Sequence, residues 1–446
     1  MIILLGWRLS IGPIALDWAG DYLKQALTSY QEDVNVDFRD AVLIWQKEER
    51  SSYAGASGLQ VIFYEVEIKN RATDFTLNVP EVSARFSGLA MLRGLLAPTN
   101  VSITGLSIDY TLGPDAWESD DDRPFVEKLE AFLRNIQNSN SLPFKMAQQL
   151  LLPPQSSRVA GYLRQVSLLD TKITLNDQLS GQQWQIPSAQ LNLQRTDSGL
   201  SVNLSGDINM ATSRIMPIDF YLLFDNDKKE AITTLAFSDL RPSALAGSVE
   251  ALSGLADMNV PSKGNIEFKI DQNFNIPVVA FNLSLGEGFI NPGKIYPEPL
   301  KITSAALNGH IVKKESSIVL DEISLQLGQT YVSGSGLLYG STDRPGIAIK
   351  ADIRDLPFLD LKTYWPGQFG KGAYKWIAKN IDGGIVQEGH LDIYIDPDMW
   401  PAVPDENTPA KLILPPDVMV FRFDFNNINA HYLRPMPMLT GIGGQA

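Results

Sequence analysis

The sequence predicts a mostly β protein in which short strands follow one another as a meandering antiparallel sheet. From Val34 onward, short segments alternate apolar and polar residues, which is the pattern of half-buried strands. Gly, Pro, Asn and Asp recur between these segments and indicate tight connections. Helical periodicity is confined to a few short stretches. Hydrophobic residues make up 44% and charged residues 20% of the chain, so it is globular and not disordered.

Charge and cysteine content exclude several classes of function. The formal net charge of −14 argues against nucleic acid as a partner, because phosphates attract basic surfaces. It also argues against binding to anionic lipid through a polybasic patch. The chain has no cysteine, so disulfides, thiol nucleophiles and cysteine metal sites are impossible.

The N-terminus opens in apolar residues but is too short to span a membrane. A spanning helix needs about 20 apolar residues, and a signal peptide needs a basic start and a small-residue cleavage site. Two interpretations are open: a buried element of a soluble domain, or the end of a membrane anchor whose start is missing. We expect a partial anchor over residues 1–18, with four anchoring side chains: Ile2, Leu5, Trp7 and Ile11.

Three regions carry the strand pattern most clearly: 34–110, 166–206 and 302–338. No strict period relates them, so the repeat is degenerate. The sequence predicts tight turns wherever turn-forming residues interrupt the alternation. In the first two regions these interruptions are Arg39-Asp40, Pro80-Glu81, Thr104-Gly105, Asp170, Gly181, Pro187 and Ser198-Gly199.

Helices are predicted in a few places only. Asp122 caps a helix over 123–138, with Pro124 in its first turn and an apolar face that includes Phe125 and Leu129. Shorter helices are expected over 87–96 and 243–258. The prolines of residues 141–158 indicate a hinge.

The residues that usually carry chemistry form no recognisable catalytic or metal motif. His310, His390 and His431 are isolated in strand patterns, where a histidine is more often a surface residue than a ligand. The acidic run 118–122 lacks the glycine of a calcium loop. The G-x-x-x-x-G-K spacing of 288–294 lacks the following hydroxyl residue. We therefore expect no enzyme activity, no cofactor and no metal.

The stretch from Tyr364 to Ile395 has the most distinctive pattern. Tyr364-Trp365-Pro366 ends the preceding element, and a short amphipathic helix follows with Tyr374, Trp376, Ile377 and Ile381 as its apolar residues. Asp382-Gly383-Gly384 ends this helix, and a long strand begins at Ile385. This order resembles the central domain of the YhdP family, among the AsmA-like envelope proteins. The residues that carry the resemblance are Tyr364, Trp365, Pro366, Trp376 and Gly384.

Two further segments are similar to the same family. Residues 8–16 look like the junction with an inner-membrane helix, and residues 80–106 like the first periplasmic repeat. The resemblance divides the chain into an anchor (1–18), an AsmA-like β unit (19–140), the hinge (141–158) and a central-type β domain (159–446). The long C-terminal half of the family is absent, so we expect this last domain to be cut short.

The resemblance implies an elongated, curved antiparallel sheet with a groove-like apolar face. The protein would then be anchored in the inner membrane, with its bulk in the periplasm, and would bind phospholipid or move it toward the outer membrane. Other envelope proteins are further partners that this role allows. From the strand alternation we expect the groove to be lined by Val42, Ile44, Leu191, Leu193, Leu204, Ile318, Leu320, Leu325 and Leu327.

Two alternatives remain open. One is an envelope scaffold or outer-membrane assembly factor with a similar β architecture but no lipid transport. The other is a hydrolase whose carboxylates gather on one face of the sheet, with Asp352, Asp355 and Asp360 as candidates. A two-sheet closed core would exclude the groove.

Overall fold

The structure is a computed structural model, and its chain forms two compact units. The first unit holds Met1–Glu118, Glu127–Leu235 and Ile270–Phe274, and the second holds Ser119–Val126, Ala236–Lys269 and Asn275–Ala446. The structure describes residues 8, 12–28, 34–46, 58–70, 75–91, 93, 95–112, 130, 150, 159–178, 181, 183–195, 198–209, 215–246, 255–291, 299–340, 344–365, 371–399, 418–432 and 435–446.

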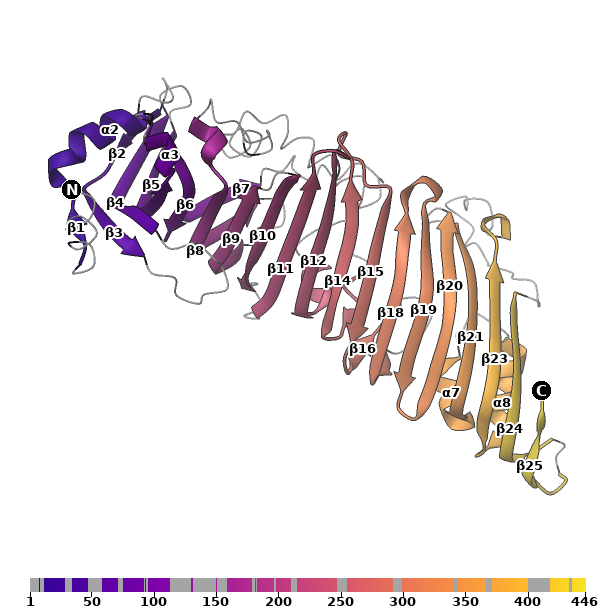
Figure 1. Cartoon of the computed structure of the whole chain (residues 1–446). Helices are drawn as coiled ribbons and strands as arrows, with labels where there is room; N and C mark the ends of the chain where they lie inside the picture. Colours follow the sequence, from indigo (N-terminus) through magenta and orange to yellow (C-terminus); the bar gives the residue numbers. More distant parts are fainter. Residues whose placement is uncertain are drawn as a thin grey trace. The chain divides into compact units, whose positions relative to one another are not determined.

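The first unit is a ladder of strands with short helices beside it (Figure 1). Its strands are β1 (Ile14–Ala15), β2 (Val34–Asp37), β3 (Asp40–Gln46), β4 (Gly58–Asn70), β5 (Phe75–Phe86), β6 (Pro98–Thr104), β7 (Ser107–Leu112), β8 (Gln165–Asp177), β9 (Gln183–Arg195), β10 (Gly199–Asn209) and β11 (Ile215–Asp225). Its helices are η1 (Asp17–Ala19), α2 (Gly20–Thr28), α3 (Gly88–Met91) and η3 (Val159–Tyr162). Strand β12 (Glu230–Leu240) contributes residues to both units.

The second unit is also built mainly of strands, with a few short helices beside them (Figure 1). They are β13 (Met258–Asn259), β14 (Ser262–Ile270), β15 (Val278–Leu285), β16 (Gly288–Ile290), β17 (Leu300–Ile302), β18 (Ser304–Val312), β19 (Ser317–Leu327), β20 (Thr330–Gly340), β21 (Pro345–Pro357), β22 (Ile381–Asp382), β23 (Ile385–Ile395), β24 (Met419–Ala430) and β25 (Leu439–Gln445). Its helices are α6 (Pro242–Ala246), η6 (Lys313–Glu315), α7 (Phe358–Tyr364), α8 (Lys371–Asn380) and η7 (Pro397–Met399).

The predicted fold class is confirmed. In the described residues, 22 strands belong to one open sheet, and β13, β16 and β17 form a small second sheet. In the described residues most strand pairs join strands that are consecutive or nearly consecutive in the sequence, as in a meander, and nearly all pairs are antiparallel. The exceptions are β6 and β7, which both run parallel to β8. Their partner follows after a long connection, as parallel pairing requires.

Several predicted turns of the first unit are instead irregularities inside longer strands. Strands β2 and β3 are not a hairpin, because both pair with β4, and the break at Arg39 lies opposite Glu65, whose φ is positive. Strand β5 continues through Pro80 without ending there, and β9 likewise continues through Pro187. Likewise β6 and β7 are one interrupted strand along β8, with Gly105 at the break.

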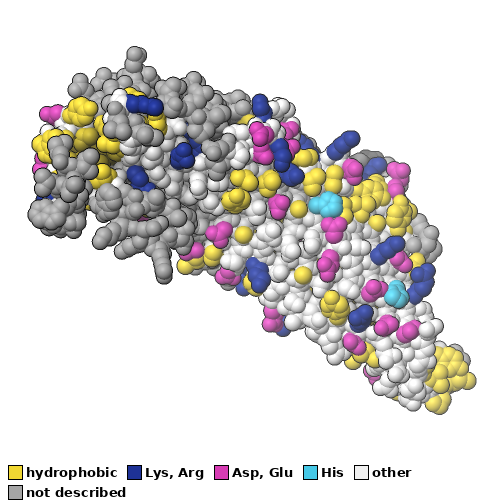
Figure 2. Space-filling view, in the orientation of Figure 1, with side chains coloured by type: hydrophobic (Ala, Val, Ile, Leu, Met, Phe, Trp, Pro, Cys, Tyr) yellow, Lys and Arg dark blue, Asp and Glu magenta, His cyan; other side chains and the backbone are white. Residues whose placement is uncertain are grey.

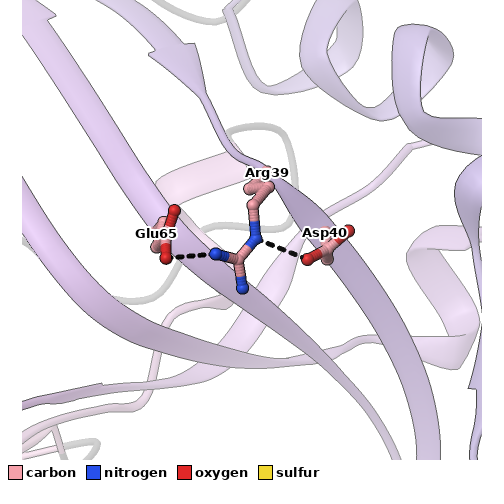
Figure 3. A network of polar contacts seen from close by, with 3 residues as sticks. All are labelled: Arg39, Asp40 and Glu65. Atoms are coloured by element: carbon pink, nitrogen blue, oxygen red, sulfur yellow. Dashed lines mark hydrogen bonds and ion pairs between the residues drawn. The ribbon is translucent and has the colours of Figure 1, made fainter.

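These irregularities align across neighbouring strands and form one crease. Glu65 in β4 and Asp170 in β8 have positive φ angles of 50° and 48°. The register of β8 on β9 shifts between Leu168 and Thr171, which leaves Asp170 in a bulge, whereas β4 keeps its register on both sides of Glu65. Pro80 lies opposite Glu65, and the Ser188 hydroxyl donates to the Asp170 carboxylate at 3.0 Å. On the β2–β3 side of the crease, the Arg39 guanidinium forms ion pairs with the carboxylates of Asp40 and Glu65 (Figure 3).

The crease bends the first unit's sheet toward one face. Phe38 and Ala41, which flank the crease, and Phe63 and Val66, which do so in β4, all lie in one buried cluster. Leu23 of α2 closes this cluster from outside the sheet. Because residues on both sides of the crease share one core, the face that carries them is concave.

Other predictions meet mixed outcomes. Helix α3 occurs within 87–96, but only Pro242–Ala246 is a helix at the start of 243–258. Near the C-terminus, β24 is a single strand, Met419–Ala430, with a bulge at Asn427. The helix at 123–138 and the hinge at 141–158 lie outside the described residues, apart from Glu130 and Leu150. The compact units divide within β12 instead.

The N-terminal anchor cannot be placed. Ile2, Leu5, Trp7 and Ile11 lie outside the described residues. In the part of the chain that the structure describes, we find no helix with the length and apolar character to cross a membrane.

Candidate functional site

One face of the second unit's sheet is apolar across every strand from β15 to β24. Residues that are paired across neighbouring strands point to the same face of the sheet. The pairing register therefore defines rows of side chains that run perpendicular to the strands. Four such rows contain only apolar residues and glycine. They are Val279–Ile311–Ile318–Leu338–Ile347–Ile395, Phe281–Gly309–Leu320–Gly336–Ile349–Ile393–Met419, Leu283–Leu307–Ile323–Gly334–Ala351–Leu391–Phe421 and Leu285–Ala305–Leu325–Val332–Ile353–Gly389–Phe423. We call this the inner face of the second unit.

The first unit has an equivalent face, the one toward which the crease bends. Two complete rows run from β3 to β11, and we call this the inner face of the first unit. They are Leu43–Val61–Ala84–Val101–Val166–Leu193–Val202–Leu222 and Ala41–Phe63–Val82–Ile103–Leu168–Leu191–Leu204–Phe220.

The row members are fully buried in some strands and only partly buried in others. At β3 to β5 the inner face is closed by α2, and Phe63 is only 3% exposed. From β6 to β11 the row members are only partly buried, including Leu193 and Leu204. In the second unit most row members, such as Leu307 and Ile349, are also partly buried. A sheet covered by a second layer would bury such residues fully. Among the described residues, these apolar rows therefore remain partly open to solvent.

Two buried clusters close the second unit's inner face near one end of the strands. Val260, Leu285, Ile302 and Leu327 form the first, beside the small sheet. The second joins α7 to β21, β23 and β24, with Phe358 edge-on to Phe423 at 5.9 Å. Tyr364 packs against both clusters. Burial raises the pKa of the Tyr364 phenol, and the nearby Asp360 carboxylate raises it further.

The segment around Tyr364 folds largely as predicted. Helix α7 ends at Tyr364, and α8 follows. The ring centroids of Trp365 and Tyr374 lie 6.2 Å apart. Helix α8 ends at Asn380, earlier than predicted, because Ile381 and Asp382 pair with β24 as strand β22. Gly383 and Gly384 have φ angles of 66° and 89° and turn the chain into β23. Pro366 lies outside the described residues.

Trp376 differs from the prediction. It was expected on the apolar side of its helix, but it is 48% exposed, while Ile377 packs into the cluster below α8.

The predicted groove residues fall on two different faces. Leu191, Leu193 and Leu204 lie on the inner face of the first unit. Val42 and Ile44 do not, because their partners Ile62 and Gln60 are on the opposite, outer face. This part of the prediction is wrong by one residue of strand register.

In the second unit the four predicted residues are all in β19 and share the inner face: Ile318, Leu320, Leu325 and Leu327. Leu327 is 6% exposed and belongs to the buried cluster by the small sheet, whereas the other three are partly buried. Sequence reasoning missed the rows of β15, β18, β21 and β23, although their alternation is as regular as that of β19.

The outer face of the second unit mixes polar side chains with exposed apolar ones such as Leu337 and Tyr394. Acidic, basic and histidine side chains are scattered over it in Figure 2. His310 Nδ1 lies 3.0 Å from Asp321 Oδ2, and His390 pairs with Asp352 on the neighbouring strand. The three carboxylates proposed for a hydrolase lie in separate places: Asp352 pairs with His390, Asp355 has a φ of 55° within β21, and Asp360 is on α7.

A shallow hollow of about 390 Å³ lies on the crease of the first unit. Glu65, Val66, Asn78, Val79 and Pro80 line it. Glu65, its one carboxylate, is already paired with Arg39 (Figure 3). No cluster of three or more potential metal-binding side chains occurs among the described residues. The inner faces are therefore the strongest candidate for a functional surface.

Comparisons with known proteins do not add to this description. Neither the models of known protein families, nor the curated proteins, nor the solved structures give a match to this chain.

Proposed function

We propose that this protein binds phospholipid by laying acyl chains on its inner faces, and that it moves lipid from the inner toward the outer membrane of a cell envelope. The observation that carries this proposal is the set of uninterrupted apolar rows on the second unit's inner face, which are partly buried and contain no polar side chain. The resemblance of residues 364–395 to the YhdP family supports the same role, with the protein held at the inner membrane.

The energetics of lipid movement explain why such a face suits this role. Each methylene transferred from a membrane to water costs about 0.8 kcal/mol, so a two-tailed phospholipid faces a penalty above about 20 kcal/mol. An apolar surface that continues from strand to strand removes most of this penalty at every step. No catalytic group is needed, since no bond is made or broken.

Charges placed on the inner faces test the proposal. Leu193→Asp and Leu325→Asp each put a carboxylate among apolar side chains, so transfer of a fluorescent phospholipid from vesicles to the protein should fall at least ten-fold. Gln194→Asp and Ser324→Asp are the matched controls, because they add the same charge on the outer face of the same strands.

The controls should transfer lipid as the unchanged protein does. Circular dichroism and thermal unfolding would establish that each variant is folded. Equal transfer by folded inner-face and outer-face variants would contradict the proposal. A protein that carries no lipid and cross-links only to envelope proteins would favour the scaffold instead.

A further inference from the structure

Helix α8 presents a basic and aromatic surface. Its sequence, Lys371 to Asn380, contains three lysines and no acidic residue. Lys375 and Lys379 are one helical turn apart, and Trp376 is three residues before Lys379, so these three side chains share a side of the helix. All three are exposed, and Trp376 is 48% exposed.

The helix is fixed in this orientation by its opposite side. Ile377 packs into the cluster with Leu356, Phe358 and Val386, and the Tyr374 ring contacts Trp365. Packing on that side leaves Lys375, Trp376 and Lys379 facing away from the sheet. Their exposure is therefore a property of the folded unit and not of a loose helix.

Further exposed apolar side chains adjoin the C-terminal end of α8. The backbone N–H of His431 donates to the carbonyl of Asn380 at 2.8 Å, which places Tyr432 beside this end. The Tyr432 hydroxyl lies 3.5 Å from the Met436 sulfur. Tyr432 is 55% and Met436 51% exposed. Figure 2 shows hydrophobic side chains gathered at this end of the second unit. We call the set Lys375, Trp376, Lys379, Tyr432 and Met436 the end patch.

The charge of the end patch is local. In the described residues, neither Lys375 nor Lys379 forms an ion pair, and Asp382 is the nearest carboxylate along the chain. The net charge of −14 is spread over the whole chain. Charges more than about 8 Å away are largely screened at physiological salt. A surface that touches the end patch would therefore meet mainly lysine charge.

We infer that the end patch adsorbs to the surface of a bilayer that contains anionic phospholipid. Trp and Tyr favour the headgroup region, where an apolar ring and a polar edge are both accommodated. Lysines beside them are attracted to anionic headgroups, and this combination is typical of interfacial helices. The inference goes beyond the proposed function, because adsorption to a bilayer requires no lipid on the inner faces.

Vesicle flotation of the whole protein tests this inference. The unchanged protein should float with vesicles of phosphatidylcholine and phosphatidylglycerol, and less with phosphatidylcholine alone. Lys375→Gln/Lys379→Gln should weaken partitioning onto the anionic vesicles by roughly 30-fold, because each lysine near such a surface contributes about five-fold. Trp376→Ala should weaken partitioning onto both kinds of vesicle.

The matched control is Lys263→Gln/Lys269→Gln, which removes the same charge from exposed positions of β14. It should leave flotation unchanged. Thermal unfolding would establish that the α8 variants are folded. An unchanged protein that does not float, or an equal loss in the α8 and β14 variants, would overturn the inference. Since flotation does not measure lipid transfer, this result is separate from the test of the inner faces.

Discussion

Gly384 shows how a single residue sets the geometry beside the inner face. Its φ of 89° is unfavourable for any side chain, and a Cβ at this position would lie 2.5 Å from Cγ1 of Ile428 and 2.8 Å from its Cα. Ile428 is 3% exposed and belongs to the cluster beneath α7. The glycine therefore allows β23 to start directly against β24.

Replacing this glycine should destabilise the second unit. Gly384→Ala combines a left-handed backbone with overpacking, and we expect a loss of about 3 kcal/mol in the free energy of unfolding. Gly372→Ala is the control, because no atom lies within 4 Å of its Cβ position in α8. It should be neutral or slightly stabilising. Denaturant unfolding measures both, and equal stabilities would contradict this reading of Gly384.

Asp225 provides a pH-dependent test at the turn that follows β11. The backbone N–H groups of Lys228 and Asp227 donate to its carboxylate and lower its pKa below 3.8. A lowered pKa in the folded state stabilises the protein above the unfolded pKa, and this contribution disappears as the pH falls through the folded value.

Asp225→Ala should therefore reduce the melting temperature at pH 7 and have less effect below about pH 3.8. Asp225→Asn keeps an acceptor oxygen without the charge, so its effect should vary less with pH. Melting curves from pH 2 to 7 measure this. A difference between Asp225→Ala and the unchanged protein that stays constant down to pH 2 would be the contrary result.

At the scale of elements, the crease shows why local sequence signals were misassigned. Pro80, Gly105 and Asp170 were predicted as turns, because a missing N–H or a positive φ is typical of turns. Bulges and strand breaks need the same residues. What separates the two cases is the pairing partner, which for Gly105 is in β8, more than fifty residues away in the sequence. Local patterns do not contain that information.

The crease also yields a prediction for Asp170. Its φ of 48° is accessible to Gly and Asp but costly for a β-branched residue. Asp170→Val should therefore lower the stability by about 1–2 kcal/mol more than Asp170→Gly, although both lose the bond from Ser188. Denaturant unfolding of the two variants decides this. A valine variant as stable as the glycine variant would show that the bulge does not constrain the strand.

Strand faces were easiest to predict where one face is polar. In β9 the sequence Leu191-Asn192-Leu193 alternates, and both leucines were assigned to the correct face. In β3 the run Ala41-Val42-Leu43-Ile44 is apolar on both faces, so alternation carried no information and Val42 and Ile44 were assigned to the wrong face. Register from the neighbouring strands was needed to decide.

At the scale of the whole molecule, net charge proved a poor guide to local surfaces. The value of −14 argued against contact with anionic lipid, yet α8 is locally basic. Charges more than about 8 Å from a contact surface are largely screened. The local distribution of charge is therefore more important for such a contact than the net charge. The apolar rows are likewise a property of assembled strands, since each strand contributes only a few side chains to an inner face.

The most direct test of the central claim is a photo-cross-linking scan along β18, from Ala305 to Ile311, with lipid-loaded protein. Acyl chains on the inner face should cross-link to probes at Ala305, Leu307 and Ile311. Gly309 is left out of the scan, because a Cβ there would lie 2.1 Å from the backbone carbonyl oxygen of Val319. Probes at Ala306, Asn308 and His310 face the other way and should give little product. The account predicts this alternation of high and low yields. Equal yields at all six positions, or the opposite alternation, would contradict it.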